Sequence, residues 1–499
     1  MNLKPIALAV LTAIIPCLSQ GQSVTTLEGI DASQVGIPQL EIDHNGAVGT
    51  KQYMEWVNSY YQAYNKTSFA PVWPTPQAGD TPWQDNNMSN CYGTGGGEGF
   101  ITFDRLASRW VLAKRASPAT NQYYYCVAIS NTDDLSSSTL AWYTYQFNIT
   151  SALGVNSSGN VYYPDWPKFG TWSDAYYATF DLEDPNNHYQ EIGVVVCALD
   201  RTNMIINATV RTQQCFSNPN PIPLKGALYL SHSLIPADID GTNAPPKTQH
   251  EYLVSIQNPP NDKKTTTSTT INLWNFHVNW TTPSKSTFLK GKLTVASYEP
   301  GCYDVTSPVN TFCVNEPSSS TTGVYVDSVG DRLMPRFAYR NFGTYGSFLL
   351  SHTVQVGTGT NQQTGVRWYE LRGNATPTLY QSGTLNNGTT LYRFTPSIAQ
   401  DNVGNAAIGY SVSSSSTHPG IRAAYWSLPN KTAPTEITIM NGTGDEENSS
   451  LWGNLTSMTV DPTDNCTFWY LNRYYAASQT GTTIDWDTRI GYFKITGCH

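Results

Sequence analysis

Candidate chemistry in this chain rests on carboxylate, guanidinium and histidine side chains that precede a set of recurring turns. Hydrolysis of a glycosidic bond needs two carboxylates that flank the bond, whereas a lyase uses arginine to neutralise a uronate and histidine or tyrosine to accept a proton. Arginine also binds sugar carboxylates through two parallel hydrogen bonds. The residues that we expect to bind substrate are Glu98, Asp165, His232, Asp331, Arg332, Arg336, His352, Arg393 and Trp452.

The spacing of three of these residues suggests how they would divide their roles. Arg332 and Arg336 are four positions apart, so in a regular strand they share a face, and Asp331 would point the opposite way. Asp331 and Arg332 could equally form a structural ion pair between repeats. Carboxylate candidates for hydrolysis are Glu98, Asp165, Asp181 and Asp331, and Trp452 and Trp166 are the better aromatic platforms.

The two histidines each follow a serine, in LSHSL and LLSHTV. Adjacent residues in a strand point to opposite faces, so Ser231–His232 and Ser351–His352 are poor nucleophile–base pairs. Histidines that are hydrogen-bonded in the core or at the rim are the better interpretation. The sequence contains no G-x-S-x-G, H-E-x-x-H, P-loop or EF-hand motif, and we expect no metal and no cofactor.

A hairpin pattern that occurs seven times along the chain must position these residues. The clearest copy is SMTVDPTDNCTFWY, in which an apolar strand, a turn on Asp, Pro and Asn, and an aromatic strand follow one another. Unequal repeats of short strands are typical of radial repetition, so we predict an all-β, seven-bladed β-propeller in a single ring. The predicted turns lie near residues 43, 104, 174, 240, 341, 401 and 461.

The propeller interpretation places the candidate site at one end of a central channel. If each turn joins the innermost strand of a blade to the second one, residues six to ten positions earlier lie at the channel mouth, Lys168 among them. Second strands return to the same end and add Arg115, Asp181, His352 and Arg473. The segment VTTLEGI could add an edge strand to the last blade and close the ring. The segment YMEWVNSYYQAY also has helical periodicity, but its position after an HNG turn favours strands.

The N-terminus and the cysteines indicate export. Residues 1–21 read as a secretory signal peptide, with Lys4 before a short apolar run, and residues 22–499 form the predicted propeller domain. Nine cysteines leave eight after the signal, an even number that favours disulfides. Connectivity cannot be deduced from spacing, but sequential pairing is the simplest: Cys91–Cys126, Cys197–Cys215, Cys302–Cys313 and Cys466–Cys498.

Thirteen N-x-S/T sequons point to a eukaryotic secretory route, and the last of them, at Asn465, adjoins Cys466 and could be blocked. The other predicted glycosylation sites are Asn65, Asn87, Asn148, Asn156, Asn207, Asn279, Asn374, Asn387, Asn430, Asn441, Asn448 and Asn454.

Charge and composition exclude some partners. Only 13% of residues are charged, the net charge is −9, and no basic run is present, so we expect no nucleic-acid partner. No stretch after the signal approaches the ~20 apolar residues of a membrane span. We therefore expect a secreted, extracellular monomer that is not inserted in a membrane.

Six segments stand out along the chain: GAVGTKQYMEWVN, PKFGTWSDAYY, VCALDR, GDRLMPRFAYRNF, GVRWYELR and SMTVDPTDNCTFWY. Together they resemble a group of secreted, mostly bacterial β-propeller proteins that are not functionally characterised, and loosely the sialidase-like class of propellers. The resemblance covers nearly the whole mature chain and implies a propeller fold and export, but no reaction.

The arginines favour a protein that binds or processes an extracellular, acidic glycan in its central channel. Two alternatives stay open, because fold does not determine function. One is a non-catalytic scaffold that presents loops to another protein. The other is a secreted tailoring enzyme whose channel holds a small metabolite.

Overall fold

A computed structural model gives the fold of this chain. The structure describes residues 23–36, 42–93, 97–219, 233–256, 267–302, 312–357, 362–386, 388, 390–453, 455–478 and 485–499, so the predicted signal peptide lies outside the described residues. Helices are confined to single turns, as the hairpin pattern predicts. Within the described ranges, no helix has both the length and the apolar character to cross a membrane.

The strands form five four-stranded sheets and an eight-stranded sheet in which β14 and β20 pair in parallel. Counting the halves of the large sheet separately, the described residues make seven four-stranded groups, which are the blades of a β-propeller. From the channel outward, the first blade consists of β2 (Asn45–Val48), β3 (Gln52–Val57), β4 (Tyr60–Asn65) and β5 (Gln77–Ala78), and the second of β6 (Phe100–Asp104), β7 (Arg109–Ala119), β8 (Gln122–Ser130) and β9 (Trp142–Asn148). The third blade consists of β10 (Tyr163–Thr171), β11 (Tyr176–Asp184), β12 (Gln190–Leu199) and β13 (Gln214–Pro219). The fourth consists of β14 (Ile235–Ile239), β15 (Glu251–Ile256), β16 (Ser268–His277) and β17 (Thr287–Tyr298).

The fifth and sixth blades follow the same order, and the seventh takes its outermost strand from the N-terminus. The fifth blade consists of β20 (Leu333–Asn341), β21 (Gly346–Val356), β22 (Gln363–Arg372) and β23 (Thr378–Leu385). The sixth consists of β24 (Tyr392–Gln400), β25 (Asn405–Ser414), β26 (Thr417–Ser427) and β27 (Thr435–Met440). The seventh consists of β28 (Ser457–Val460), β29 (Thr467–Tyr475), β30 (Trp486–Lys494) and β1 (Thr25–Asp31). Outside the blades lie β18 (Phe312–Val314), β19 (Val326–Asp327), α1 (Ala32–Val35), α2 (Thr81–Gln84), α3 (Thr150–Leu153), α4 (Arg201–Met204), α5 (Ser319–Thr322) and a 3₁₀ turn, Pro283–Lys285.

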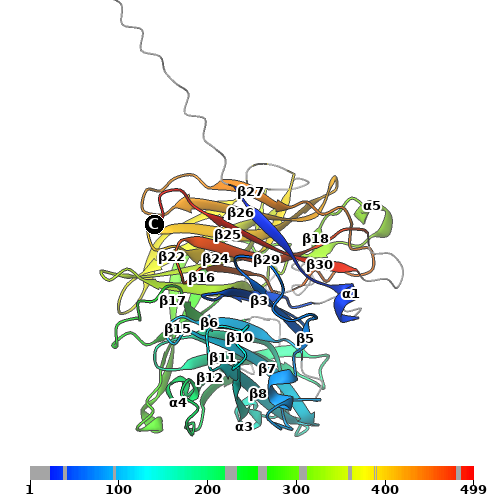
Figure 1. Ribbon diagram of the computed structural model, residues 1–499. Helices are drawn as coiled ribbons and strands as arrows, with labels where there is room; N and C mark the ends of the chain where they lie inside the picture. Colours follow the sequence, from blue (N-terminus) through cyan, green and yellow to red (C-terminus); the bar gives the residue numbers. More distant parts are fainter. Residues whose placement is uncertain are drawn as a thin grey trace, which may run out of the picture.

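The innermost strands contact one another in a closed cycle, β2, β6, β10, β14, β20, β24, β28 and back to β2. Strand β1 pairs antiparallel with β30, so the predicted closing strand is confirmed; in Figure 1 this blue strand runs beside the red β30. Glu55 of β3 holds the closure, since its carboxylate accepts hydrogen bonds from Ile30 N (2.6 Å), Tyr64 Oη (2.7 Å) and Thr488 Oγ1 (2.9 Å). When a ring is closed in this way, the strand edges of the first and last blades are covered.

Six of the seven predicted hairpin turns lie where the sequence places them, and the first does not. Asn45 and Gly46 belong to β2, and the turn falls at Gly49, whose N–H donates to Gln52 O. The HNG segment is instead an inter-blade contact, because the Asn45 side chain accepts from Ile101 N and donates to Gly99 O. YMEWVNSYYQAY forms β3 and β4, which confirms the strand interpretation.

Aromatic rings pack the blades against one another. Tyr53 stacks on Trp469 between the first and seventh blades, with ring centroids 5.4 Å apart, and Trp368 meets Trp426 between the fifth and sixth at 4.9 Å. These rings are nearly fully buried. Large, paired aromatics therefore supply much of the apolar area that holds adjacent blades together.

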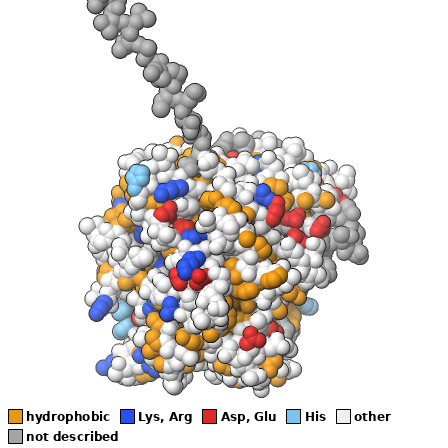
Figure 2. All heavy atoms as spheres, in the orientation of Figure 1, with side chains coloured by type: hydrophobic (Ala, Val, Ile, Leu, Met, Phe, Trp, Pro, Cys, Tyr) orange, Lys and Arg blue, Asp and Glu red, His pale blue; other side chains and the backbone are white. Residues whose placement is uncertain are grey.

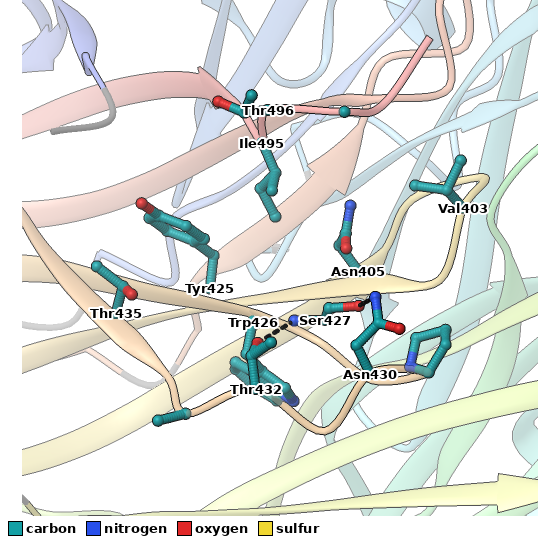
Figure 3. Close-up of a pocket in the computed structure, with 13 residues that line it drawn as sticks. Val403, Asn405, Tyr425, Trp426, Ser427, Asn430, Thr432, Thr435, Ile495 and Thr496 are labelled. Atoms are coloured by element: carbon teal, nitrogen blue, oxygen red, sulfur yellow. Dashed lines mark hydrogen bonds between the residues drawn. The ribbon is translucent and has the colours of Figure 1, made fainter. Parts of the chain in front are cut away.

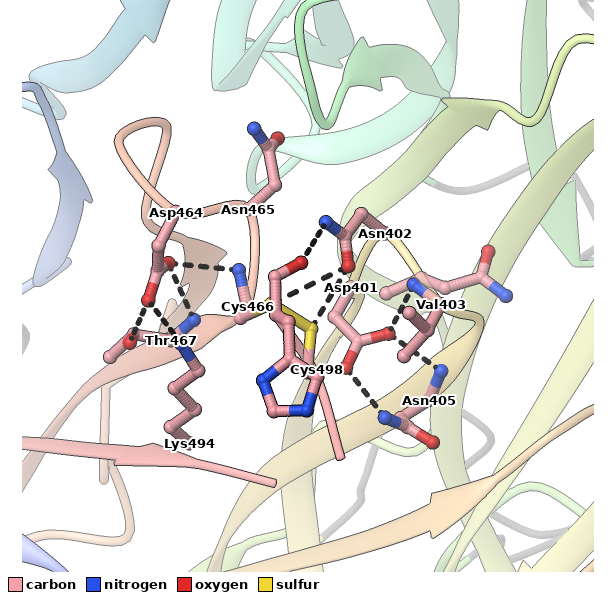
Figure 4. The surroundings of a disulfide bond; sticks show 12 residues. Asp401, Asn402, Val403, Asn405, Asp464, Asn465, Cys466, Thr467, Lys494 and Cys498 are labelled. Carbon is pink, nitrogen blue, oxygen red and sulfur yellow. Dashed lines mark hydrogen bonds and ion pairs between the residues drawn. A yellow bond between two sulfur atoms is a disulfide. The ribbon is translucent and has the colours of Figure 1, made fainter. Parts of the chain in front are cut away.

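The four predicted disulfides are confirmed, each with the expected partner. Cys466–Cys498 ties the C-terminal segment to the last hairpin, and the side-chain oxygen of Asn402 lies 3.4 Å from Cys466 Sγ and 2.9 Å from Cys498 Sγ (Figure 4). The end of the chain is thus fixed against both the sixth and the seventh blade.

Charged side chains fill the channel toward the hairpin turns. The Arg336 guanidinium donates to Asp238 Oδ2 (2.7 Å), Asp240 Oδ1 (2.9 Å) and Met458 O (3.1 Å). Asp238 also accepts from Thr171 N, and Arg105 lies 3.5 Å from Asp240. The fourth, fifth and seventh blades therefore meet on one buried arginine, the third reaches it through Asp238, and the second reaches it through Asp240.

Replacing Arg336 by alanine should lower the free energy of unfolding by about 3–5 kcal/mol, because Asp238 and Asp240 would stay buried without their cation. Chemical denaturation followed by tryptophan fluorescence measures this. Arg109→Ala is the matched control: Arg109 donates only to carbonyls of its own turn, so a change within about 0.5 kcal/mol is expected. Equal losses in the two variants would contradict the role of Arg336.

Removal of Cys466–Cys498 by the double Cys→Ser substitution should lower the free energy of unfolding by about 2–4 kcal/mol. The sequence separation is 32, against 11 for Cys302–Cys313. Loop-closure entropy then predicts a loss about 1 kcal/mol smaller for the shorter bridge. Denaturation of both double variants checks the order, and a larger loss at Cys302–Cys313 would refute the entropic account.

Candidate functional site

The innermost strands all begin at the end of the ring opposite the hairpin turns, and the backbone is unusual there. Non-glycine residues with positive φ recur on or just before these strands. Asp43 (39°), Glu98 (59°) and Ser233 (50°) lie two positions before β2, β6 and β14, whereas Trp166 (49°) and Thr395 (47°) lie within β10 and β24. Each is six or seven positions before the first residue of its hairpin turn. Such conformations are strained, and they concentrate at functional sites. The channel mouth is therefore the place to look for a site.

Side chains from four blades converge on a small opening at this mouth. Asp43, Glu98, Trp166, Lys168 and Leu455 line it. Its volume is about 10 Å³, which is room for one water molecule. Since the channel below is filled by the Arg336 network, a ligand must lie on the mouth and cannot thread through the ring.

Carboxylates face one another across the strands of the third blade. Asp165 of β10 lies directly opposite Asp181 of β11, and Glu183 of β11 directly opposite Glu191 of β12. Like charges in such positions destabilise a sheet. Two of these pairs side by side are a reason to expect a function, because perturbed carboxylates are typical of catalytic and binding sites.

The crowding changes proton affinity at the mouth. Burial, and then the neighbouring Asp165 and Asp43, raise the pKa of Glu98 well above its usual value, although Arg115 opposes this. Part of the rise comes from the close approach of the Asp165 carboxyl group to that of Glu98. Burial, Asp165 and Glu191 raise the pKa of Glu183 to about 8. With a pKa of about 8, the carboxyl group of Glu183 holds its proton at neutral pH, and such a group can donate it.

Two cations flank the ring of Trp166. The Arg332 guanidinium lies 4.0 Å and the Lys168 ammonium 4.4 Å from its centroid. Arg332 also makes two hydrogen bonds to Asp331, at 2.8 and 3.1 Å. Burial lowers the pKa of Lys168 to about 8. The ring of Trp166 is therefore occupied by cation–π contacts and does not offer an open face on which a ligand could stack.

A second aromatic group extends from the carboxylates toward solvent. Arg115, which pairs with Glu98 at 3.1 Å, stacks on Tyr163 at 4.3 Å. Tyr163 meets the edge of Tyr189 at 5.6 Å, and Tyr189 is 55% exposed. Tyr189 is thus a large aromatic side chain with room for a ligand beside the acidic group.

Glu98, Asp165, Asp331 and Arg332 come together at the mouth, whereas the other candidates lie elsewhere. Arg336 is in the channel interior. Arg332 lies just before β20, which bulges between Met334 and Ala338, so the regular alternation from which a shared face with Arg336 was expected does not hold over this stretch. Arg393 is 1% exposed and donates to Glu436 of the outermost strand β27.

His352 and Trp452 are also buried. His352 lies within hydrogen-bonding distance of Tyr369 Oη (3.1 Å), and burial lowers its pKa to about 3, so it is neutral. Trp452 donates to Ser411 Oγ and carries Arg473 on its ring at 4.6 Å. His352 fits the core-residue interpretation, whereas Trp452, which we expected to be an aromatic platform, is 1% exposed and packs in the core. His232 lies outside the described residues.

Sequence reasoning missed Asp43, Glu183, Glu191, Tyr163 and Tyr189. A signal for Glu183 was present, because it is two positions from Asp181 and so on the same face of β11. Tyr163 likewise precedes Asp165 by two. Tyr189 has a positive φ in a connection between strands, and nothing in its sequence context indicates that.

The surface carries no large patch of one sign on the face shown in Figure 2, where acidic and basic side chains are interspersed. Among the residues that the structure describes, no three His, Cys, Asp or Glu side chains are grouped to hold a metal ion.

No family model matches the chain, and no curated protein matches it. Among solved structures it is similar to an α-L-arabinanase of Penicillium chrysogenum, with 8% identity, 93% of this chain and 98% of that one covered, and a TM-score of 0.36. It is also similar to an endo-arabinase of Bacteroides thetaiotaomicron, with 14% identity, 70% of this chain and 95% of that one covered, and a TM-score of 0.28. For the Trypanosoma rangeli sialidase the identity is 9%, the coverage is 79% of this chain and 53% of that one, and the TM-score is 0.32. These values are too low to assign an activity. The resemblance to secreted bacterial propellers stays a prediction.

Stability should fall as pH rises if the mouth carboxyl groups hold protons. Glu183 has a pKa of about 8 in the fold and about 4.5 when unfolded, so its stabilising contribution is complete below pH ~4.5 and is lost as pH rises toward 8. Thermal unfolding from pH 5 to 9 should show a declining Tm, less steep in Glu183→Gln. Asp85→Asn, at an exposed position, is the control. Parallel curves for Glu183→Gln and the wild type would contradict the assignment.

Proposed function

We propose that the protein binds a glycan at the channel mouth and acts on it through the proton-holding carboxyl groups there. The observation that carries this proposal is the set of opposed carboxylates in the third blade beside the exposed ring of Tyr189. A sugar ring can stack on such an aromatic face, while a carboxyl group that is protonated at neutral pH can donate to a glycosidic oxygen.

The Glu98–Asp165 pair would act as one unit. The two carboxyl groups are close enough for Asp165 to raise the pKa of Glu98, whereas the acid and base of a glycoside hydrolase lie roughly 5–9.5 Å apart to flank the bond. The pair therefore supplies a single proton donor, and Arg115 at 3.1 Å from Glu98 stabilises the carboxylate left behind. A second carboxylate across the opening, such as Asp43, would complete hydrolysis.

The charged side chains at the channel mouth also bear on the charge of the glycan. Arg332 and Lys168 could bind an acidic sugar, as the sequence suggests, but Arg332 is already engaged by Asp331 and carboxylates outnumber the cations. A neutral glycan would meet less repulsion. Neutral and acidic glycans therefore have to be compared.

Export, glycosylation and a monomeric state are part of the proposal. Four disulfides fit an oxidising compartment. Of the described sequon asparagines, Asn156 is buried and donates to Asp184 Oδ1, so a glycan there would disrupt the turn. The exposed ones are Asn87, Asn148, Asn207, Asn374, Asn430, Asn441 and Asn448; Asn65 and Asn279 are half-buried, and Asn387 and Asn454 lie outside the described residues.

A glycan array and a polysaccharide-degradation screen of the purified protein test the proposal. The wild type should bind at least one glycan. Tyr189→Ala should weaken binding at least tenfold, since base or sugar stacking on an aromatic ring is worth roughly 1–3 kcal/mol. Glu98→Gln should abolish turnover while binding is retained. For an acidic ligand, Arg332→Ala and added salt should both lower affinity.

Tyr380→Ala is the matched control, because Tyr380 is equally exposed, at 52%, and lies on the outermost strand of the fifth blade. No binding or turnover of any glycan would overturn the proposal and favour a protein scaffold or a small-metabolite enzyme. Binding that Tyr189→Ala leaves unchanged would remove the mouth from the site.

A further inference from the structure

A larger concave surface lies at the other end of the blades. It is bordered by the β24–β25 turn, the ends of β26 and β27, and the C-terminal segment after β30, and its volume is about 540 Å³. That is within the range of small-molecule sites in proteins. In Figure 3 the side chains of Tyr425, Asn405 and Ile495 surround an open space, with Ser427, Asn430 and Thr432 below it. We call this surface the β26 groove.

The chemistry of the β26 groove differs from that of the channel mouth. None of the described residues that line it is charged. Tyr425 offers a half-buried aromatic ring, while asparagine, serine and threonine side chains supply donors and acceptors. A ligand with apolar C–H faces and many hydroxyl groups satisfies both, and an ionic ligand would find no counter-charge. These features are those of a neutral saccharide.

The walls of the groove are fixed before any ligand arrives. Ser427 N donates to Thr432 Oγ1 (2.8 Å) and Asn430 Nδ2 to Ser427 Oγ (3.0 Å), which closes the loop after β26. The opposite wall, which includes Ile495, is held by Cys466–Cys498 and by the Asn402 amide, which donates to His499 O (3.3 Å). A preformed groove avoids the entropy of ordering loops on binding.

We propose that the β26 groove binds a neutral saccharide, independently of the channel mouth. Two sources could supply the sugar. One is a free oligosaccharide. The other is a glycan attached to Asn430, whose sequon includes Thr432, so that both residues of the motif lie in the groove. In that case an oligosaccharide is transferred from a polyprenyl diphosphate donor to Asn430 Nδ2, which loses a proton as the sugar–phosphate bond breaks.

The free source is tested with protein made in a bacterial periplasm that lacks N-glycosylation. Isothermal titration with neutral trisaccharides (cellotriose, xylotriose, maltotriose and chitotriose) should show millimolar or tighter binding that is insensitive to salt. Tyr425→Ala should weaken it at least tenfold, and Tyr380→Ala should leave it unchanged. A melting curve of Tyr425→Ala confirms that the fold is retained.

The attached source is tested with protein secreted by yeast. Peptide mass spectrometry should find a glycan on Asn430 that resists a native endoglycosidase and becomes susceptible in Tyr425→Ala. A loss of trisaccharide binding in Tyr425→Ala supports the groove with a free oligosaccharide as its ligand. A gain of endoglycosidase susceptibility in the same variant supports it with the glycan on Asn430 as its ligand. The proposal is overturned if neither preparation shows a Tyr425-dependent sugar, whatever happens at the channel mouth.

Discussion

The structure depends on the buried guanidinium of Arg336. It is 6% exposed and is bonded to Asp238, Asp240 and the carbonyl of Met458, so side chains from separate blades are held at a fixed distance across the channel. A charge buried to this extent is tolerated only when its partners are close and well aligned. Together with the closure of the ring by β1 and Glu55, it determines that the channel is plugged toward the turns and that ligands meet the ring at its ends.

That rigidity explains how the mouth can carry unfavourable local features. Opposed carboxylates and left-handed residues such as Glu98 each destabilise the fold locally. Aromatic packing, four disulfides and the Arg336 network offset these terms at a distance. Protonation of Glu98, whose pKa is raised by burial and by Asp165, removes one of two adjacent charges and so relieves part of this repulsion. In the proposed function, the same proton is the one that is donated.

The sequence was sufficient for features that depend on short-range patterns. Asp and Asn turns between apolar strands located six of seven hairpins, and cysteine order gave all four bridges. It failed where a partner is distant: Asp238 and Met458 are 98 and 122 positions from Arg336. Bulges such as that in β20 also change which side chains share a face, and they leave no clear trace in composition. Tyr189 could not be predicted either, because its positive φ in a connection between strands is not indicated by its sequence context.

The two proposed sites differ in one physical property, which is the charge of the side chains that line them. The mouth gathers titratable groups around a narrow opening, so whatever binds there has its affinity coupled to protons. The β26 groove has aromatic, amide and hydroxyl groups but no charge among its described lining, so binding there is decoupled from pH and salt. Innermost strands such as β24 run from the first surface toward the second, and the hydrogen-bonded blades between them are stiff. In the proposed arrangement, proton chemistry and neutral-saccharide recognition are kept apart, because the mouth is lined by residues of the first, second, third and seventh blades and the β26 groove by residues at the turn end of the sixth and seventh.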